Sequence, residues 1–444
     1  MMKMRETLWI GFWALLLLSA GAKSAFSAPT IQQWQTKNGV NVLYVPVAQL
    51  PIVDIRIVFD AGSARDQGKA GLASLTSNLL MTGAGAWDAG QIANQLESVG
   101  AELSTGARTD MAWLSLRSLV NPAPLEQALS VFESILVAPT FEETEVARLK
   151  KQMLITLDDI EQSPDQVAQR AFIAAAYGRH PYGSPKEGTP ESVEELTRKA
   201  VVDFFNQFYV AENAVVAIVG DVSRVEAEAL VERLVGRMKT GEPALSLPEV
   251  PQLKAAKTIH IPFPSTQSTV LIGQPGMARG ADDYFPLYLG NHIFGGGGFS
   301  SILMTEIREK RGLVYSVYSY FIPMAEDGPY TIGLQTRHTQ VETALNIVYE
   351  NLKQFIEEGP SETQLEASKL NITGSEPLRT DSNRKIVEYL AMMGFYGLPL
   401  DYLETFSEKI RAVSQTDIQK AFQRKIQTDK LVTVVVGGEK APSP

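Results

Sequence analysis

The order of secondary-structure elements expected in the first half of the chain recurs in the second half. Residues 51–61 alternate as a strand and precede a loop and helix over 62–81, while 269–273 again predict a strand and 282–294 a helix. Each half also ends with a helix, a short loop and a buried strand. The repeat predicts an internal duplication, so we expect an α+β protein with two homologous domains. Each domain should hold a mixed, largely antiparallel sheet with helices packed on one face.

A proline-containing stretch separates the two copies. Residues 237–257 include three prolines, which interrupt any helical or strand period and favour an extended connector. The chain is too long for one ordinary domain, and its 45% apolar content is ample for packed cores. We therefore expect an N-terminal domain over 29–236, a linker over 237–257 and a C-terminal domain over 258–444.

The first 28 residues have the features of a secretory signal peptide. Lys3 and Arg5 precede an apolar run over 8–18, which is short for a membrane span, and small residues follow it. Cleavage after Ala22 or Ala28 fits this pattern, and an uncleaved anchor is the alternative. The absence of cysteine excludes disulfides and a lipid-anchored cysteine. We expect a periplasmic bacterial protein without a stable membrane anchor.

The chain is acidic, with a formal net charge of −10. The leader carries a net charge of +1 from Lys3, Arg5 and Glu6, so its removal takes the charge from −10 to −11. An acidic surface argues against nucleic acid or an anionic membrane as a partner, and it is neutral towards cationic peptides.

Four consecutive glycines open the stretch of the second half that carries candidate chemistry. Their backbone freedom permits positive φ angles and the close approach of another chain, although a flexible turn is the simpler interpretation. An amphipathic helix should follow and end at Gly312, and residues 314–321, rich in valine and tyrosine, predict a strand. The glycines are Gly295, Gly296, Gly297 and Gly298.

Arg308 falls near the end of that helix, seven positions before Tyr315 at the start of the strand. A fixed cation and a phenol at this spacing could converge on one substrate oxygen. The alternative is that Arg308 belongs to a solvated, charged helix face and that Tyr315 is an aromatic residue packed on the sheet.

This stretch resembles the C-terminal half of the pitrilysin or insulinase type of metallopeptidase, close to the two-subunit group that includes the mitochondrial processing peptidase. In that family an arginine and a tyrosine at this spacing polarise the scissile carbonyl, which implies the same role for Arg308 and Tyr315. The glycines fall where the processing peptidase carries its glycine-rich loop, which implies a place at the substrate chamber. The resemblance extends over nearly the whole chain after the leader.

The zinc motif of that family is degenerate in this sequence. The family carries H-x-x-E-H on the helix that follows a G-S-x-x-D loop. The loop is present over 62–66, but Ser74 and Asn78 stand at the histidine positions and Ser77 at the glutamate position. The remaining ligand position falls at or near Thr156. None of these side chains suits zinc, so the resemblance implies that this chain binds no metal itself.

Histidine offers no second zinc site in the sequence. No two of the four histidines lie within one helical turn of each other. We expect His180 to be a loop histidine that caps backbone groups, and His292 to be half-buried, with a substrate contact as the alternative for His292. The four are His180, His260, His292 and His338.

Together these features imply a division of roles between two chains. The expected function is the zinc-free subunit of a periplasmic heterodimeric metallopeptidase, whose partner is a homologous chain that carries H-x-x-E-H and the zinc. Arg308 and Tyr315 would complete the partner's site, and the substrate would be a short or unfolded polypeptide. Two alternatives remain: a non-catalytic peptide-binding or assembly protein of the same fold, and a peptidase that acts alone through an unorthodox metal site.

Overall fold

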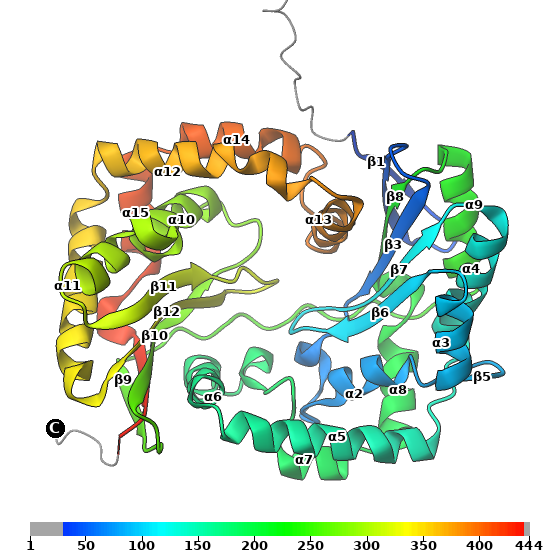
Figure 1. The fold of residues 1–444 in the computed structure, drawn as a ribbon, viewed down its shortest axis with the longest axis horizontal. Coiled ribbons are helices and arrows are strands. Elements are labelled where there is room, and N and C mark those ends of the chain that lie inside the picture. Colours follow the sequence, from blue (N-terminus) through cyan, green and yellow to red (C-terminus); the bar gives the residue numbers. More distant parts are fainter. Residues whose placement is uncertain (1–29, 439–444) are drawn as a thin grey trace, which may run out of the picture. The chain divides into compact units, whose positions relative to one another are not determined.

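The computed structural model describes residues 30–438. The signal peptide expected over 1–28 lies outside the described residues. From Ile31 onward the chain forms one compact unit that contains two large β-sheets (Figure 1). Within the part of the chain that the structure describes, no helix combines the length and apolar character that crossing a membrane requires.

The first sheet is built from the N-terminal half. In order across the sheet, its strands are β1 (Gln32–Gln35), β2 (Asn41–Pro46), β8 (Ala214–Gly220), β3 (Ile52–Phe59), β7 (Ala112–Leu119) and β6 (Glu102–Ala107). Strands β2 and β8 run parallel and the other neighbours run antiparallel. The edge strands are therefore β1 and β6. A short hairpin, β4 (Gly83–Ala84) and β5 (Trp87–Asp88), lies apart from this sheet.

The second sheet repeats this arrangement in the C-terminal half. In order, its strands are β9 (Lys257–Ile261), β13 (Val432–Val436), β10 (Gln267–Met277), β12 (Gly328–Arg337) and β11 (Val314–Phe321). Again one neighbouring pair, β9 and β13, is parallel and the others are antiparallel. Strand β11 thus occupies the edge that corresponds to β6 in the first sheet. The expected α+β architecture with a duplicated, mixed sheet is confirmed.

The described residues form helices in both halves, and several of these helices cover one face of the sheet of their own half. In the first half they are α2 (Leu72–Leu79), α3 (Ala89–Glu97), α4 (Pro122–Val137), α5 (Glu143–Glu161), α6 (Pro164–Tyr177), α7 (Pro190–Glu195), α8 (Arg198–Phe208) and α9 (Arg224–Val235). In the second half they are α10 (Tyr284–Asn291), α11 (Val341–Glu358), α12 (Glu362–Gly374), α13 (Asn383–Phe395), α14 (Tyr402–Ala412) and α15 (Gln415–Lys425). Short helical turns include η1 (Ser63–Arg65), η2 (Pro181–Gly183), η4 (His292–Gly296), η5 (Gly298–Ser300), η6 (Met304–Glu309) and η8 (Glu376–Arg379).

The opposite face of each sheet is covered by a helix from the other half (Figure 1). Helix α6 packs on β10 and β13, where Phe172 shares a buried cluster with Leu271 and Val434. Helix α13 packs on β8 and β3 of the first sheet. A Cβ atom on Gly394 would lie 2.5 Å from Val215 Cγ1, so glycine there permits the close approach of α13. The expectation of helices on one face alone is thus incomplete, because each half also donates a helix to the other.

The stretch expected as a linker is fixed to its surroundings. No helix or strand is present from 239 to 256, but Leu247 and Val250 pack against the cluster around α6. The Arg65 guanidinium donates to the Leu245 carbonyl at 2.6 Å, and a His180 ring nitrogen lies 2.8 Å from the Pro248 carbonyl oxygen. These contacts fix the position of the connector, residues 239–256, along the boundary (seam) between the two halves.

Candidate functional site

Arg308 and Tyr315 are brought together by a tight turn between η6 and β11. Arg308 lies in the wide helical turn η6, in which the Lys310 N–H donates to the Thr305 carbonyl. Gly312 has a φ of +61° and donates its N–H to the Arg308 carbonyl, which ends the helix as expected. Strand β11 starts two residues later. As a result, the Arg308 guanidinium carbon lies 5.2 Å from the centre of the Tyr315 ring.

Tyr315 points outward because β11 contains a bulge at this position. Val314 pairs with Thr336 and Val317 with Leu334, so one extra residue is accommodated between them. A bulge of this kind re-aims a side chain at a sheet edge. Tyr315 is 82% exposed, which excludes the alternative of an aromatic side chain packed on the sheet.

Arg308 is set apart from the charged groups on its own helix. The Glu306 carboxylate pairs with Lys310 at 2.5 Å and with Arg311 at 2.8 Å, and these two cations lower the pKa of Glu306. Among the described residues, no carboxylate lies within 4 Å of the Arg308 guanidinium. Its charge therefore remains available to a ligand.

A second aromatic ring, from a residue that precedes Arg308 in the chain, also contacts the Arg308 guanidinium. The Arg308 guanidinium carbon lies 5.0 Å from the centre of the Phe299 ring, and Phe299 is 69% exposed. Two exposed rings thus contact one guanidinium, an arrangement that favours a fixed cation through cation–π attraction. Phe299 is a candidate site residue that the sequence did not reveal, because a single phenylalanine between glycine and serine has no periodic signal.

The four glycines serve different purposes. Only Gly298 has a positive φ, of +61°. Gly295 is buried, and a Cβ atom there would lie 2.3 Å from Ser319 Oγ in β11. Gly297 similarly faces the His292 carbonyl oxygen, which would be 2.7 Å from an added Cβ. Gly296 and Gly298 are exposed and are the two whose backbone a ligand can reach. The expectation of positive φ angles along the run is therefore correct for one glycine only.

The degenerate zinc positions are occupied by neutral side chains. Ser74, Ser77 and Asn78 lie on α2, where Ser77 is buried and Asn78 is exposed. The Ser74 hydroxyl donates to the Lys186 carbonyl at 2.7 Å, and the Thr156 hydroxyl on α5 donates to the Gln152 carbonyl at 3.0 Å. Zinc in proteins takes thiolate, imidazole or carboxylate ligands, so these residues do not fit the ion. Within residues 30–438, no group of three or more histidine, aspartate or glutamate side chains is arranged to hold a metal.

The loop before α2 is organised by a buried carboxylate. Asp66 is 1% exposed and accepts the N–H groups of Gly71 and Ala73 at 2.9 and 2.8 Å. It therefore caps the start of α2, where backbone donors lack partners within the helix. Burial raises the pKa of Asp66 to about 7.

The two histidines singled out from the sequence have structural contacts. His180 contacts the connector through one ring nitrogen, and its Nδ1 accepts the Tyr182 N–H at 3.1 Å, which confirms its assignment as a capping residue. The His292 ring nitrogens lie 3.1 Å from Ser368 Oγ and 3.2 Å from Asn371 Oδ1 on α12. Burial lowers the pKa of His292. His292 is half-buried, as expected, and its ring is engaged by α12.

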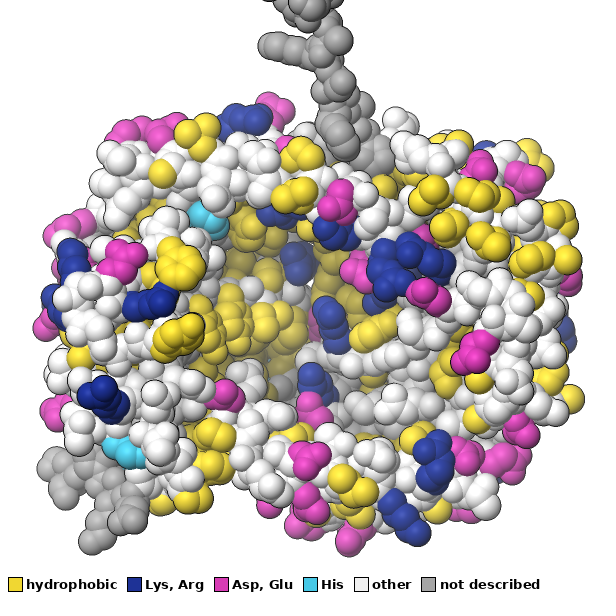
Figure 2. All heavy atoms as spheres, viewed as in Figure 1, with side chains coloured by type: hydrophobic (Ala, Val, Ile, Leu, Met, Phe, Trp, Pro, Cys, Tyr) yellow, Lys and Arg dark blue, Asp and Glu magenta, His cyan; other side chains and the backbone are white. Residues whose placement is uncertain are grey.

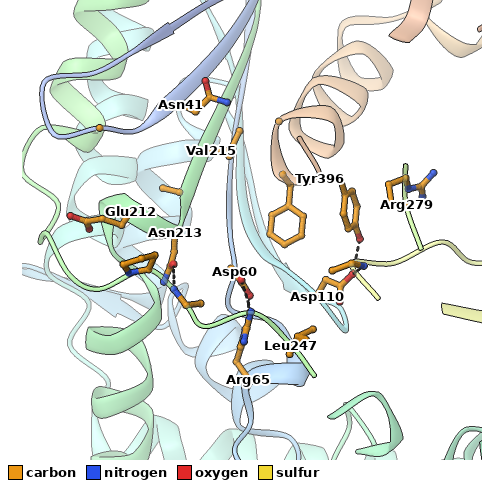
Figure 3. Close-up of a pocket in the computed structure, with 17 residues that line it drawn as sticks. Asn41, Asp60, Arg65, Asp110, Glu212, Asn213, Val215, Leu247, Arg279 and Tyr396 are labelled. Carbon is orange, nitrogen blue, oxygen red and sulfur yellow. Dashed lines mark hydrogen bonds and ion pairs between the residues drawn. The ribbon is translucent and has the colours of Figure 1, made fainter. Parts of the chain in front are cut away.

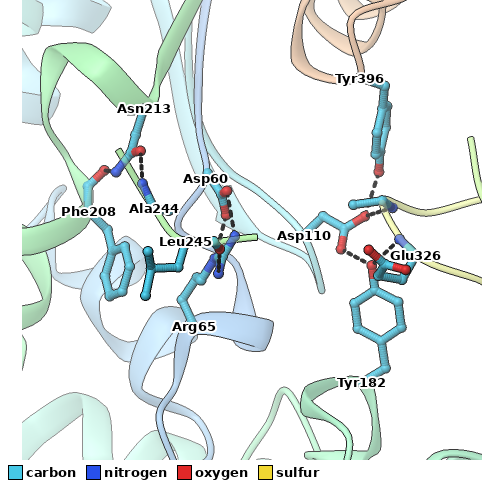
Figure 4. A network of polar contacts seen from close by, with 11 residues as sticks. Asp60, Arg65, Asp110, Tyr182, Phe208, Asn213, Ala244, Leu245, Glu326 and Tyr396 are labelled. Carbon is cyan, nitrogen blue, oxygen red and sulfur yellow. Dashed lines mark hydrogen bonds and ion pairs between the residues drawn. The ribbon is translucent and has the colours of Figure 1, made fainter. Parts of the chain in front are cut away.

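Asp110 joins the two halves at the seam between them. It lies in the turn between β6 and β7, is 4% exposed, and accepts the Tyr182 hydroxyl at 2.7 Å. From the second half it accepts the Tyr396 hydroxyl at 2.9 Å and the Ala325 N–H at 2.8 Å (Figure 4). Burial raises the pKa of this carboxyl group. Three donors from both halves converge on one side chain, which fixes the relative position of α13 and the first sheet.

A polar cavity of about 480 Å³ lies beside this seam (Figure 3). Several of its charged groups already have partners: Arg65 forms two 2.6 Å contacts with the Asp60 carboxylate, and Asp110 is satisfied as described above. The Asn213 amide oxygen accepts the Ala244 N–H of the connector at 2.7 Å. Arg279, which also lines this cavity, has no carboxylate partner among the described residues. Because Arg65, Asp110 and Asn213 are bonded to other groups of the protein, we interpret this cavity as part of the joint between the halves.

The space between the two sheets is hollowed on the face shown in Figure 2, with hydrophobic side chains deep in the hollow and lysine and arginine side chains along its wall. The strand order β9, β13, β10, β12, β11 of the second sheet matches the order β2, β8, β3, β7, β6 of the first, which has β1 in addition, and each half donates a helix to the other. These features define a duplicated α+β fold. The pair of Arg308 and Tyr315 lies in its second half, and serine and asparagine side chains occupy the degenerate positions on α2 in its first half.

The chain belongs to peptidase family M16, the insulinase family. Residues 42–190 match the family model described as insulinase (peptidase family M16), and residues 195–372 match the model described as peptidase M16 inactive domain. A solved structure from Pseudomonas fluorescens, described as a peptidase M16 inactive domain, is 37% identical, with a TM-score of 0.89 over 93% of this chain and 99% of that one.

Curated relatives carry two kinds of name. An uncharacterized zinc protease of Rickettsia bellii is 26% identical over 90% of this chain and 96% of its own length. A protein of Helicobacter pylori named non-peptidase homolog YmxG is 25% identical over 90% of this chain and 92% of its own length. The family thus includes proteins named as proteases and a protein named as a non-peptidase.

Proposed function

We propose that this chain is the zinc-free subunit of a two-chain peptidase. In this proposal, Arg308 and Tyr315 contact the scissile peptide at the zinc site of a homologous partner that carries H-x-x-E-H. The signal peptide expected over 1–28 supports a periplasmic location. The match to an inactive M16 domain and the serine and asparagine side chains on α2 support a chain that is not catalytic by itself.

The observation that carries the proposal is the pair formed by the exposed Tyr315 and the half-buried Arg308, whose guanidinium has no carboxylate partner among the described residues. Attack on a peptide carbonyl places negative charge on its oxygen, and donors fixed beforehand around that oxygen lower the barrier. The Arg308 guanidinium supplies positive charge and N–H donors, and the Tyr315 hydroxyl adds a directional donor. A purely structural arginine would be expected to pair with a carboxylate, and a purely structural tyrosine would be expected to be buried.

The edges of the sheets offer a way to hold the peptide. Strand β11 is an edge strand and carries Tyr315, and β6 is the matching edge of the first sheet. An extended peptide can add to such an edge through main-chain hydrogen bonds, which give affinity with little sequence preference. This mode of binding suits short or unfolded polypeptides.

The proposal is tested by co-expressing this chain with a homologous chain that carries H-x-x-E-H and measuring peptide turnover by the purified complex. Loss of one donor to a developing oxyanion typically lowers kcat by about 10²–10³-fold, so we expect a fall of this order for Arg308→Ala. Arg311→Ala is the matched control, because Arg311 is exposed and paired with Glu306. Unchanged turnover in an intact Arg308→Ala complex would reject the proposal.

A second candidate function is a non-catalytic peptide-binding or assembly protein. The name of the Helicobacter pylori relative, a non-peptidase homolog, favours it. In that case Arg308 and Tyr315 are remnants, and their substitution changes neither turnover by any partner nor assembly. The same variants therefore separate the two functions.

A further inference from the structure

A cationic cavity of about 510 Å³ lies in the second half, away from the pair of Arg308 and Tyr315. It is lined by residues of η8 and α13 and by the first residues of α10 and α14, and its volume falls within the range of small-ligand sites. We call it the arginine–tyrosine pocket. Its polar lining consists of Arg279, Arg379, Lys385, Glu388, Tyr284, Tyr389 and Tyr402.

Arg279 is held in place by aromatic rings and retains unused donors. Its guanidinium carbon lies 5.8 Å from the centre of the Tyr284 ring and 5.5 Å from that of Tyr396. The contact from its Nη1 to the Tyr284 hydroxyl is long, at 3.4 Å. Its Nε is buried and has no hydrogen-bond partner among the described residues. A buried donor without a partner costs free energy, so the protein's own groups do not fully satisfy this guanidinium.

Arg379, which also lines the pocket, is likewise held by aromatic side chains. Its Nη2 donates to the Tyr288 hydroxyl at 2.7 Å, and its Nη1 lies 3.5 Å from the Tyr389 hydroxyl. Its guanidinium carbon lies 4.3 Å from the centre of the Phe406 ring. A guanidinium carries five N–H donors, so phenol oxygens satisfy only part of it and do not neutralise its charge.

The carboxylates near the pocket are directed to other cations. Glu388 lines the pocket, but its carboxylate lies 3.9 Å from Arg56 Nη1 of the first sheet. Lys385 pairs with Asp381 at 2.9 Å. Within residues 30–438, neither Arg279 nor Arg379 has a carboxylate within 4 Å. Two positive charges in this pocket are therefore uncompensated, although the whole chain has a net charge of −10.

We propose that the arginine–tyrosine pocket binds a carboxylate group of the peptide ligand. This inference rests on the proposed function only in taking a peptide as the ligand. Planar guanidinium groups match the geometry of a carboxylate. Aromatic surroundings exclude water and so strengthen the attraction between these groups and a carboxylate. Leu378 and Met392 also line the pocket and give an apolar surface for the residue that carries the carboxylate. The carboxylate is that of a chain terminus or of an acidic side chain.

The test measures peptide binding to the full chain alone by fluorescence anisotropy. The probes are one fluorescein-labelled peptide with a free C-terminal carboxylate, the same peptide as its amide, and an amidated version with one internal glutamate. We expect a carboxylate-bearing probe to bind at least about tenfold more tightly than the plain amide, since hydrogen bonds to charged groups are the strong ones. The free acid and the glutamate probe distinguish the two sources of the carboxylate.

Substitutions assign the effect to the pocket. Arg279→Gln and Arg379→Gln are expected to remove the preference for the carboxylate probe. Arg379→Lys is expected to keep part of the preference, because lysine retains the positive charge but lacks the planar set of N–H donors of the guanidinium. Arg411→Gln, at an exposed arginine near the end of α14, is the matched control. Thermal unfolding of each variant checks that it is folded.

Equal binding of the plain amide and of both carboxylate-bearing probes, or a preference that survives both glutamine variants, would overturn the inference. So would a failure of the unaltered chain to bind any carboxylate probe. Arg308→Ala should keep the preference, because Arg308 lies outside the pocket. A failure of the two-chain proposal would appear in turnover, whereas a failure of this inference appears in binding to the single chain.

Discussion

The Arg308 guanidinium carbon lies 5.2 Å from the centre of the Tyr315 ring, and no carboxylate of the described residues approaches that guanidinium within 4 Å. A helix ending at Gly312 and a bulge at the start of β11 create this relationship. The helix end at Gly312 turns the chain sharply toward β11, and the bulge turns Tyr315 away from the sheet.

Phe299 should act by positioning Arg308. Phe299→Leu keeps an apolar side chain but removes the ring, and an exposed cation–π contact is worth about 0.5–1 kcal/mol. We expect kcat of the two-chain complex to fall about two- to fivefold, with Phe299→Tyr close to the unaltered protein. Equal loss of activity in the Phe299→Leu and Phe299→Tyr variants would contradict a role for the aromatic ring in positioning Arg308.

Gly295 should be required for space and Gly298 for backbone conformation. An added Cβ at Gly295 would lie 2.3 Å from Ser319 Oγ, so we expect Gly295→Ala to lower the free energy of unfolding by about 1–3 kcal/mol through overpacking. Gly298→Ala meets no atom within 4 Å but must hold a positive φ, at a cost of about 1–2 kcal/mol. Urea denaturation measures both. An unchanged stability for Gly295→Ala would contradict the close approach of β11.

Asp110 should stabilise the joint between the halves. In Asp110→Asn one carboxylate oxygen becomes an NH₂ group that faces existing donors, and an unsatisfied buried group costs about 1–3 kcal/mol. We expect a loss of this size in the free energy of unfolding. Asp203→Asn is the control, because its contact with Lys199 is exposed and such pairs contribute about 0–1 kcal/mol. Equal effects of the two substitutions would contradict the role of Asp110.

Asp66 should make stability depend on pH between about 4 and 7. Burial raises its pKa from 3.8 to about 7, so the folded state favours the neutral carboxyl group. Its contribution to stability is fully present below the unfolded pKa and is lost as pH rises through the folded pKa. The stability of the unaltered protein relative to Asp66→Asn should therefore fall from pH 4 to pH 7. Unfolding curves at a series of pH values test this, and a constant difference would contradict it.

Local features of the fold could be predicted from sequence, because they depend on neighbouring residues. The strand expected over 51–61 contains β3, and the strand expected over 314–321 has the same bounds as β11. The meeting of Arg308 and Tyr315 was also predictable, since seven positions and one glycine separate a helix end from a strand start. Each of these inferences needs only short-range geometry.

Long-range features could not be predicted in this way. The donation of α6 and α13 between the halves depends on contacts such as Gly394 with Val215, which no local pattern records. The arginine–tyrosine pocket draws Arg279 and Arg379 from segments far apart in the chain. Sequence also cannot distinguish a glycine needed for φ from one needed for space, and for this reason Gly295 and Gly298 looked alike.

The central claim is that Arg308 and Tyr315 act together on one oxygen at a partner's zinc site. A double-mutant cycle on the assembled complex, with Arg308→Ala, Tyr315→Phe and the pair, tests it most directly through kcat. We expect each single change to lower kcat strongly and the double change to cost clearly less than the two losses combined, as for groups that act as a unit. Full activity in the double variant, with the complex intact, would contradict the claim.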